Sequence, residues 1–275
     1  MNAGRIVRGC LITTIMCSAL EPALAGLSAG AAVVDITPTS LPVVVNGGFL
    51  SRTADRVKTP LRARSLAVAD GSSTAVIVLA DSCMLDRSLL DDVKLRATER
   101  TGIPPSHMLI AATHTHSAPA ATGCLGTEPD AAYVPFLRDR LLEAIVRAAV
   151  RLEPVHVGFA RAAAPEFTAL RRWFLRPDAM QRDPFGQLSV RANMHAPSAG
   201  LDRVTGETGP EDPALELISF RALDGRPVAV LANFSMHYFG DSDLSADYFG
   251  LFCEGLRERL EPVPVPGRAP FVALF

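Results

Sequence analysis

Short apolar runs alternate along the chain with longer stretches in which apolar residues recur every three or four positions. A short apolar run closed by Gly, Pro or Asp is typical of a β-strand, and the wider spacing is typical of a helix with one buried face. The pattern predicts strands at 31–36, 41–45, 65–69, 74–80, 108–113, 155–160, 215–220, 227–234 and 271–275, and helices from 86 to 100, from about 135 to just before Pro154, and from 245 to 260.

The order of these elements predicts an α/β fold. Asp70-Gly71 joins the strands at 65–69 and 74–80 as a hairpin, and the helix from residue 86 and the strand at 108–113 follow. A strand, a helix and a strand in this order form a crossover unit, so we expect a mixed β-sheet with flanking helices. The run at 271–275 reaches the last residue without a turn or a polar end, so we expect the sheet to be incomplete at the C-terminus.

Two histidines follow the apolar run at 108–113. Residues i and i+2 of a strand share a face, so His114 and His116 are expected to point the same way. Neutral imidazole is a common zinc ligand, although the pattern fits an ordinary structural pair equally well. Asp81 ends the preceding strand, and we expect it at the same sheet edge, where its carboxylate would orient a ligating imidazole. Capping a helix is the commoner use of such an aspartate.

The segment between about 162 and 213 has no clear periodicity and is interrupted by prolines. A long irregular segment inside a domain is usually functional or disordered. This one contains Trp173 and other apolar residues, so we expect an ordered excursion over the site. It carries Arg171 and Arg172, a pair that fits a solvated surface as well as it fits a pocket.

The composition excludes some partners and favours a secreted protein. The 275 residues carry a formal net charge of −2 and no basic block, so nucleic acid is not an expected partner. Arg5 and Arg8 precede an apolar stretch at 10–20 and the small-residue triplet Ala23-Leu24-Ala25. This is the layout of a signal peptide at 1–25, and no later stretch is long enough to span a membrane. We therefore expect a secreted or periplasmic protein.

The cysteines beyond the signal peptide are Cys83, Cys124 and Cys253. Their number and spacing indicate neither a disulfide framework nor a paired metal-ligand motif. We expect small buried residues, and one disulfide among them is left open.

Several motifs, in their order along the chain, carry a family resemblance. They are the run from Gly102 to Pro119, which includes Thr113-His114-Thr115-His116, together with Val34-Asp35-Ile36-Thr37-Pro38, Gly209-Pro210-Glu211-Asp212-Pro213, Asn233-Phe234-Ser235-Met236-His237 and Ser245-Ala246-Asp247-Tyr248. With them, the sequence resembles the N-terminal catalytic domain of the neutral/alkaline non-lysosomal ceramidase family, as a divergent bacterial-type member truncated at its C-terminus. Residues 26–275 would then be the N-terminal part of that domain.

The resemblance implies a zinc amidase that splits N-acylsphingosine into sphingosine and a fatty acid. It makes His114 and His237 zinc ligands that converge in space and places His116 beside the metal as a catalytic residue. Arg171 would hold the oxyanion that develops during the reaction. It also implies that the nucleophilic serine and the remaining glutamate and tyrosine ligands come after residue 275. A catalytic zinc polarises a carbonyl and acidifies its bound water, and an arginine adds fixed positive charge, so the chemistry fits a small-molecule or lipid amide substrate.

Two other functions remain open from the sequence. One is a different His-x-His metallohydrolase, such as an amidohydrolase barrel or a metallo-β-lactamase-like enzyme. The latter expects an Asp-His pair directly after His-x-His, where Ala118-Pro119 stands here. The other is a non-catalytic secreted binding protein that retains the fold.

Overall fold

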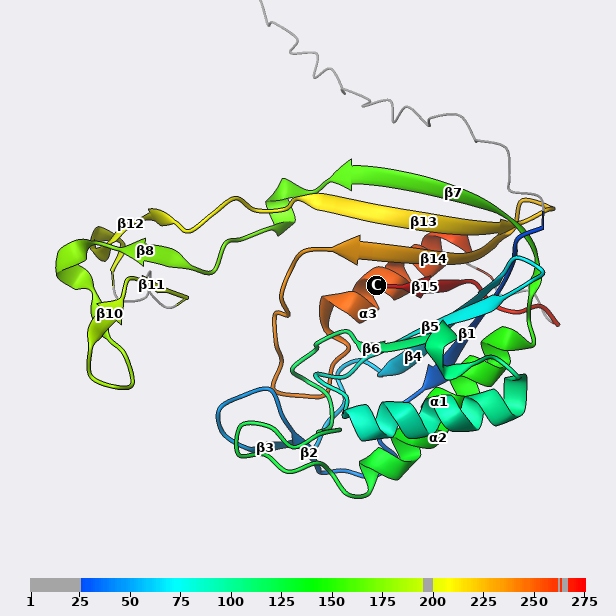
Figure 1. Cartoon of the computed structure of the whole chain (residues 1–275), viewed down its shortest axis with the longest axis horizontal. Helices are drawn as coiled ribbons and strands as arrows, with labels where there is room; N and C mark the ends of the chain where they lie inside the picture. The colour runs from blue at the N-terminus through cyan, green and yellow to red at the C-terminus, as the bar shows by residue number, and fades with distance from the viewer. Residues whose placement is uncertain (1–25, 195–199, 262, 264–266) are drawn as a thin grey trace, which may run out of the picture.

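The main body of the molecule is a curved, mixed β-sheet flanked by helices (Figure 1). The computed structural model describes residues 26–194, 200–261, 263 and 267–275, so the predicted signal peptide at 1–25 lies outside the described residues. The sheet has eight strands in the order β15-β14-β13-β7-β1-β4-β5-β6. These strands are β1 (Ser28–Asp35), β4 (Arg62–Ala69), β5 (Thr74–Ala80), β6 (Met108–Ala112), β7 (Glu153–Ala163), β13 (Ala214–Ala222), β14 (Pro227–Phe234) and β15 (Val272–Leu274).

Neighbouring strands are antiparallel except for two pairs, β5 with β6 and β14 with β15. The sheet is therefore mixed, as the sequence predicts, and the fold class is α/β. The predicted hairpin is β4–β5, and the predicted crossover runs from β5 through a helix to β6. The helices in the described residues are α1 (Arg87–Thr101), α2 (Tyr133–Ala149) and α3 (Asp247–Leu260). None of them is long and apolar enough to cross a membrane.

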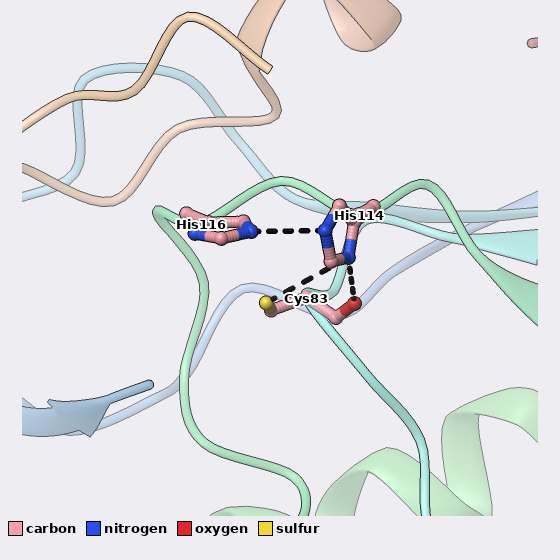
Figure 2. Close-up of side chains that lie close together, drawn as sticks. All are labelled: Cys83, His114 and His116. Carbon is pink, nitrogen blue, oxygen red and sulfur yellow. Dashed lines mark hydrogen bonds between the residues drawn. The ribbon is translucent and has the colours of Figure 1, made fainter. Parts of the chain in front are cut away.

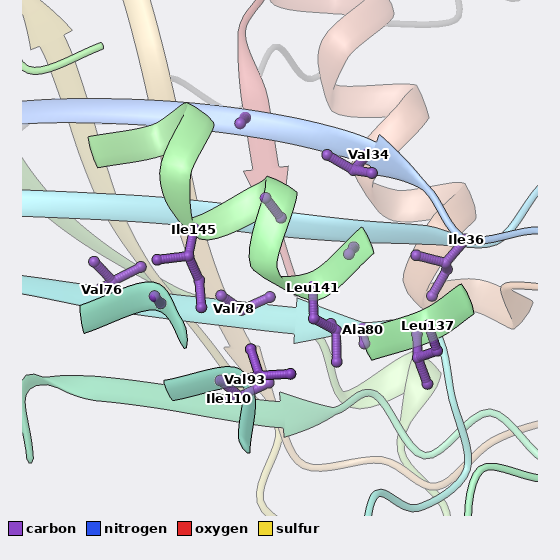
Figure 3. Close-up of a cluster of buried hydrophobic side chains, with 14 of the residues drawn as sticks. Val34, Ile36, Val76, Val78, Ala80, Val93, Ile110, Leu137, Leu141 and Ile145 are labelled. Atoms are coloured by element: carbon purple, nitrogen blue, oxygen red, sulfur yellow. The ribbon is translucent and has the colours of Figure 1, made fainter. Parts of the chain in front are cut away.

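One face of the sheet packs against α1 and α2. Leu137, Leu141 and Ile145 recur at helical spacing along α2 and are fully buried. Figure 3 shows them lying over the valines of the sheet, among them Val76 and Val78 of β5. Each fully buried aliphatic side chain contributes about 1.5–3 kcal/mol, so this stripe anchors α2 on the sheet and explains why its periodicity is readable in the sequence.

The other face of the sheet folds back on itself. Residues of β1, β4, β13, β14 and β15 form one buried cluster there, and β15 contacts β4 directly although four strands separate them in the sheet order. A shared pocket is lined by Leu79 of β5, Leu109 of β6, and Leu231 and Phe234 of β14. This curvature brings the ends of β6 and β14 together, although five strands lie between them in the sheet order.

The segment between β7 and β13 is more regular than the sequence suggests. It forms small sheets of short strands, and Figure 1 shows it as an arm that extends from the ends of β7 and β13. In its described residues, 163–194 and 200–213, the segment is ordered, as the sequence predicts. It contains strands that the sequence pattern does not reveal, because strands of two to four residues are too short to show a period. They are β8 (Trp173–Leu175), β9 (Gln181–Arg182), β10 (Leu188–Val190), β11 (Ala192–Asn193) and β12 (Val204–Glu207).

Two further predictions shift in detail. The apolar run at 41–45 becomes β2 (Val43–Val45), which pairs with a strand that the pattern does not show, β3 (Arg52–Ala54). Ser245, expected to cap the helix through Leu260, lies two residues before α3, and its hydroxyl accepts a hydrogen bond from the Asp247 amide.

Candidate metal centre

His114 lies just beyond β6, where the chain leaves the sheet. The Thr113 amide still bonds the Ala80 carbonyl and the His114 amide bonds the Ser82 carbonyl, each at 2.9 Å. His114 itself has a φ of +73°, in the left-handed region that side chains other than glycine rarely adopt. The strand alternation that predicts a shared face for the two histidines therefore does not apply. Their rings meet nevertheless, because the left-handed turn folds His116 back toward His114.

The two imidazoles face each other through their Nε2 atoms, which lie 3.0 Å apart (Figure 2). His114 Nδ1 lies 2.9 Å from the Cys83 carbonyl oxygen. A carbonyl can only accept a hydrogen bond, so Nδ1 of His114 carries the proton and Nε2 of the neutral ring keeps its lone pair. That lone pair points at His116.

His116 is held by an aromatic ring and by a glycine. Its ring stacks on Tyr238 with a centroid distance of 3.6 Å. Burial, reinforced by His114 and His237, lowers the pKa of His116 to about 4. Within the described residues its buried Nδ1 makes no hydrogen bond of ordinary geometry. The Gly47 backbone lies close to it and raises the pKa of the ring slightly against the effect of burial. The ring is therefore neutral at pH 7.

His237 arrives from the loop after β14. Its ring centroid lies 5.1 Å from that of His114 and 5.3 Å from that of His116, which confirms that His114 and His237 converge. Burial lowers the pKa of His237, and the nearby Arg171 guanidinium lowers it further. Arg171 Nη1 lies 2.8 Å from His237 Nδ1. The structure thus brings four of the sequence-predicted residues together, three imidazoles and one arginine.

Asp81 is at the same sheet edge but does not contact these rings. It is completely buried, and its Oδ2 accepts hydrogen bonds of 2.8 Å from the Arg64 guanidinium and from the Arg62 amide. The expectation that Asp81 orients a ligating imidazole is wrong, because the Cys83 carbonyl, and not Asp81, accepts the hydrogen bond from Nδ1 of His114. Strand β4 places the buried Arg64 beside Asp81, and a carboxylate buried this deeply needs such a partner to balance its charge.

The sequence interpretation missed Cys83. One ligand atom each from Cys83, His114 and His116 lies within 4.8 Å of the others, so within the described residues this group is able to hold a metal ion. Thiolate and imidazole suit zinc and similar transition ions, which fits the donor set to the metal that the resemblance implies. Burial raises the pKa of the free Cys83 thiol to about 11. Its position in the sequence was the signal that could have identified it. Cys83 follows the end of β5, which pairs in parallel with β6, so it lies at the same sheet edge as His114.

Comparison with solved structures gives a clear fold match. The crystal structure of neutral ceramidase from Pseudomonas aeruginosa superposes with a TM-score of 0.66 and 18% identity, over 91% of this chain and 38% of that chain. This chain shares its fold with neutral ceramidase. A structure of ceramidase complexed with C2 gives a TM-score of 0.64, again at 18% identity, over 91% of this chain and 37% of that one.

The match supports the family resemblance at the level of the fold. The chain spans little more than a third of the length of these ceramidases. No family model matches the sequence, and no curated protein matches it. The amidohydrolase-barrel alternative is wrong about the fold, because that barrel needs eight parallel strands and this sheet is mixed.

Proposed function

We propose that this chain forms part of the active centre of a zinc-dependent hydrolase that cleaves the amide bond of an N-acylsphingosine, or of a closely related lipid or small-molecule amide. One observation carries the proposal. His114 and His237 come from segments far apart in the sequence, yet their rings lie 5.1 Å apart, with Arg171 on the outer nitrogen of His237. The ceramidase fold supports the choice of substrate class.

His114 and His237 are the residues that would hold the ion. The Cys83 carbonyl fixes the tautomer of His114, so that Nε2 faces the centre with its lone pair free. When bound, zinc polarises a carbonyl group and lowers the pKa of a coordinated water molecule. His116 lies beside that position with a neutral ring that Tyr238 holds by stacking. Its Nε2 lies 3.0 Å from Nε2 of His114 and donates to the lone pair there while that position holds no ion.

Arg171 supplies the positive charge. A guanidinium is always protonated, and a fixed cation stabilises the negative charge that develops on a carbonyl oxygen during amide cleavage. Its hydrogen bond to His237 sets its position at the edge of the cluster. Because Arg171 belongs to the arm, the arm positions a catalytic group at the centre.

The test uses the complete gene product that contains this sequence. We expect zinc-dependent release of fatty acid from N-acylsphingosine, reversed by a chelator and restored by zinc. His114→Ala and His237→Ala should abolish it. His107→Ala is the matched control, because His107 is exposed at the opposite end of β6, where it bonds Ser73.

Release that survives both chelation and His114→Ala would overturn the proposal. A protein that binds N-acylsphingosine without cleaving it would also overturn it and would favour a binding function. The secreted or periplasmic location stays a prediction that rests on residues 1–25.

A further inference from the structure

We propose that Asp247 and Tyr248, at the start of α3, are positioning residues for His237, because they fix the backbone on both sides of it. This assignment rests on the proposed function, since it gives the two residues a task at the same centre. It adds no ligand to that centre. It explains how a histidine that arrives on a loop keeps one place relative to the histidines that follow β6.

The loop that carries His237 leaves β14, passes the β2–β3 hairpin and returns to α3 (Figure 1). Its later part is tied to that hairpin, because Arg52 donates to the carbonyls of Asp241 and Ser242. The part around His237 is not. Among the described residues, the backbone of 236–240 hydrogen-bonds only with Phe234 and with the first two residues of α3. The place of His237 therefore depends on α3.

Tyr248 holds the side of the loop that precedes His237. Its hydroxyl donates a hydrogen bond of 2.8 Å to the carbonyl of Met236, the residue directly before His237. The ring of Tyr248 packs separately, with its centroid 4.1 Å from that of Phe249 and 5.5 Å from that of Phe275. Removal of the hydroxyl alone therefore releases the loop and leaves the packing of the ring in place.

Asp247 holds the side that follows His237. Its carboxylate accepts hydrogen bonds from the amides of Phe239, at 3.2 Å, and of Gly240, at 2.7 Å, the second and third residues after His237. It also accepts a bond of 2.7 Å from the Tyr248 amide, so one buried carboxylate joins the loop to the first turn of the helix. Bonds to an ionised acceptor are about twice as strong as bonds between neutral groups.

The backbone of Asp247 points to the same role. Its φ of +55° lies in the left-handed region, which is unfavourable for residues other than glycine, although aspartate and asparagine enter it more readily than most. Strain of this kind gathers at functional sites and persists only where the surrounding contacts compensate for it. A glycine would adopt this conformation freely. The presence of an aspartate is therefore explained by the bonds of its carboxylate.

Two rings of the centre move with the segment that α3 holds. One is the imidazole of His237, and the other is Tyr238, which stacks on the His116 ring with a centroid distance of 3.6 Å. A binding constellation needs its side chains within about 0.5 Å of the productive geometry. Asp247 and Tyr248 therefore contribute to metal affinity without touching the ion.

Tyr248→Phe tests the bond before His237. We expect the affinity of the complete gene product for Zn²⁺, measured by calorimetric titration, to fall by roughly 10–100-fold, the scale of losing an outer partner of a metal site. Tyr133→Phe is the matched control, because the Tyr133 hydroxyl also donates a bond of 2.8 Å to a backbone carbonyl, that of Ile36. Both variants should lose similar stability in urea without metal, and only Tyr248→Phe should lose affinity.

Asp247→Asn tests the bonds after His237. Asparagine tolerates the left-handed backbone but offers one acceptor oxygen in place of two, so we expect a loss of affinity on the same scale. Asp247→Gly relieves the strain and removes both oxygens, so the affinity should fall further. Asp130→Asn is the matched control, because the Asp130 carboxylate also accepts bonds from three backbone amides, those of Val44, Ala132 and Tyr133.

NMR of the metal-free protein with ¹⁵N-labelled histidine rings gives a second readout. We expect the ring signals of His237 and His116 to shift in Tyr248→Phe and Asp247→Asn and to stay in place in the two controls. Ring signals that stay in place in the test variants would overturn the inference, as would equal losses of affinity in test and control variants. The two test variants alter different atoms, so one decides the question if the other fails to fold.

The remaining outcomes separate this inference from the proposed function. A wild type that binds no Zn²⁺, with ring signals that shift as expected, would overturn the proposed metal centre and support the positioning of the two rings. Affinity losses as expected in a complete protein that cleaves no amide would support the inference and overturn only the proposed reaction.

Discussion

Arg171 Nη1 lies 2.8 Å from His237 Nδ1, and this contact joins the arm to the end of β14. A guanidinium can only donate, so Nδ1 of His237 accepts, and the ring is neutral with its proton on Nε2. The same guanidinium lowers the pKa of His237. For His237 to bind a metal through Nε2, its proton must move or leave, so Arg171 and the metal act on the same ring from opposite sides.

Arg171→Ala tests the role of this contact. In the complete gene product we expect turnover to fall by roughly 10²–10³, the scale of losing one oxyanion donor, with no loss of bound metal, because Arg171 does not assist metal binding at His237. Arg172→Ala is the matched control, because Arg172 is the exposed neighbour of Arg171 and its backbone carbonyl, which the substitution keeps, accepts a hydrogen bond from Thr208. Rates and bound metal are measured together. Equal, small effects of the two substitutions would make the pair an ordinary surface feature.

Gly47→Ala tests the packing beneath the cluster. The added methyl group would meet both His116 and Cys83, so we expect metal affinity and stability to fall together. Gly71→Ala is the control, because Gly71 also has a positive φ, +88°, but nothing lies within 4 Å of an added Cβ there. Both variants carry backbone strain on the order of 1 kcal/mol, so the difference between them isolates the contact. Metal affinity that is equal in both variants would contradict the proposed arrangement.

The stability of the metal-free protein should depend on pH through His116. Its folded pKa of about 4 lies below the ordinary value of 6.5, so the folded state binds fewer protons than the unfolded state in this range. The contribution is present above pH 6.5 and is lost as the pH falls through about 4. His116→Gln should flatten the fall in the free energy of unfolding across this window, as measured by urea denaturation. An unchanged slope would show that the pKa of His116 is the same in the folded and unfolded states.

The buried ion pair of Arg64 and Asp81 should be strongly coupled. Arg64→Met leaves a buried carboxylate without its partner, and we expect a loss of about 3–5 kcal/mol. Asp81→Asn removes the buried partner of the guanidinium, which keeps only its 3.7 Å ion pair with Glu254, and retains an acceptor for the Arg62 amide. The double variant should lose clearly less than the two single losses added together.

The control for this cycle is an exposed ion pair on α1. Arg87→Met removes the pair with Asp91 and should cost less than about 1 kcal/mol. Additive losses in the Arg64–Asp81 cycle would show that the two charges are solvated separately.

Local pattern predicted most of the elements. The stripe of Leu137, Leu141 and Ile145 predicts α2, and the Asp70-Gly71 turn predicts the β4–β5 hairpin. These features are readable because burial of one face imposes a period on neighbouring residues, and a tight turn imposes a residue type. The resemblance added the fold, and the fold match confirms it.

Tertiary structure decided how the site is assembled. The sequence places His114 and His237 after separate strands, but the sheet order separates those strands, and only the curvature of the sheet brings their ends together. The left-handed turn at His114, the pairing of Asp81 with Arg64 and the arrival of Cys83 at the cluster are likewise invisible to periodicity. A period reports which face of an element is buried. Which distant element covers that face depends on long-range packing, and this packing determines the chemistry of the centre.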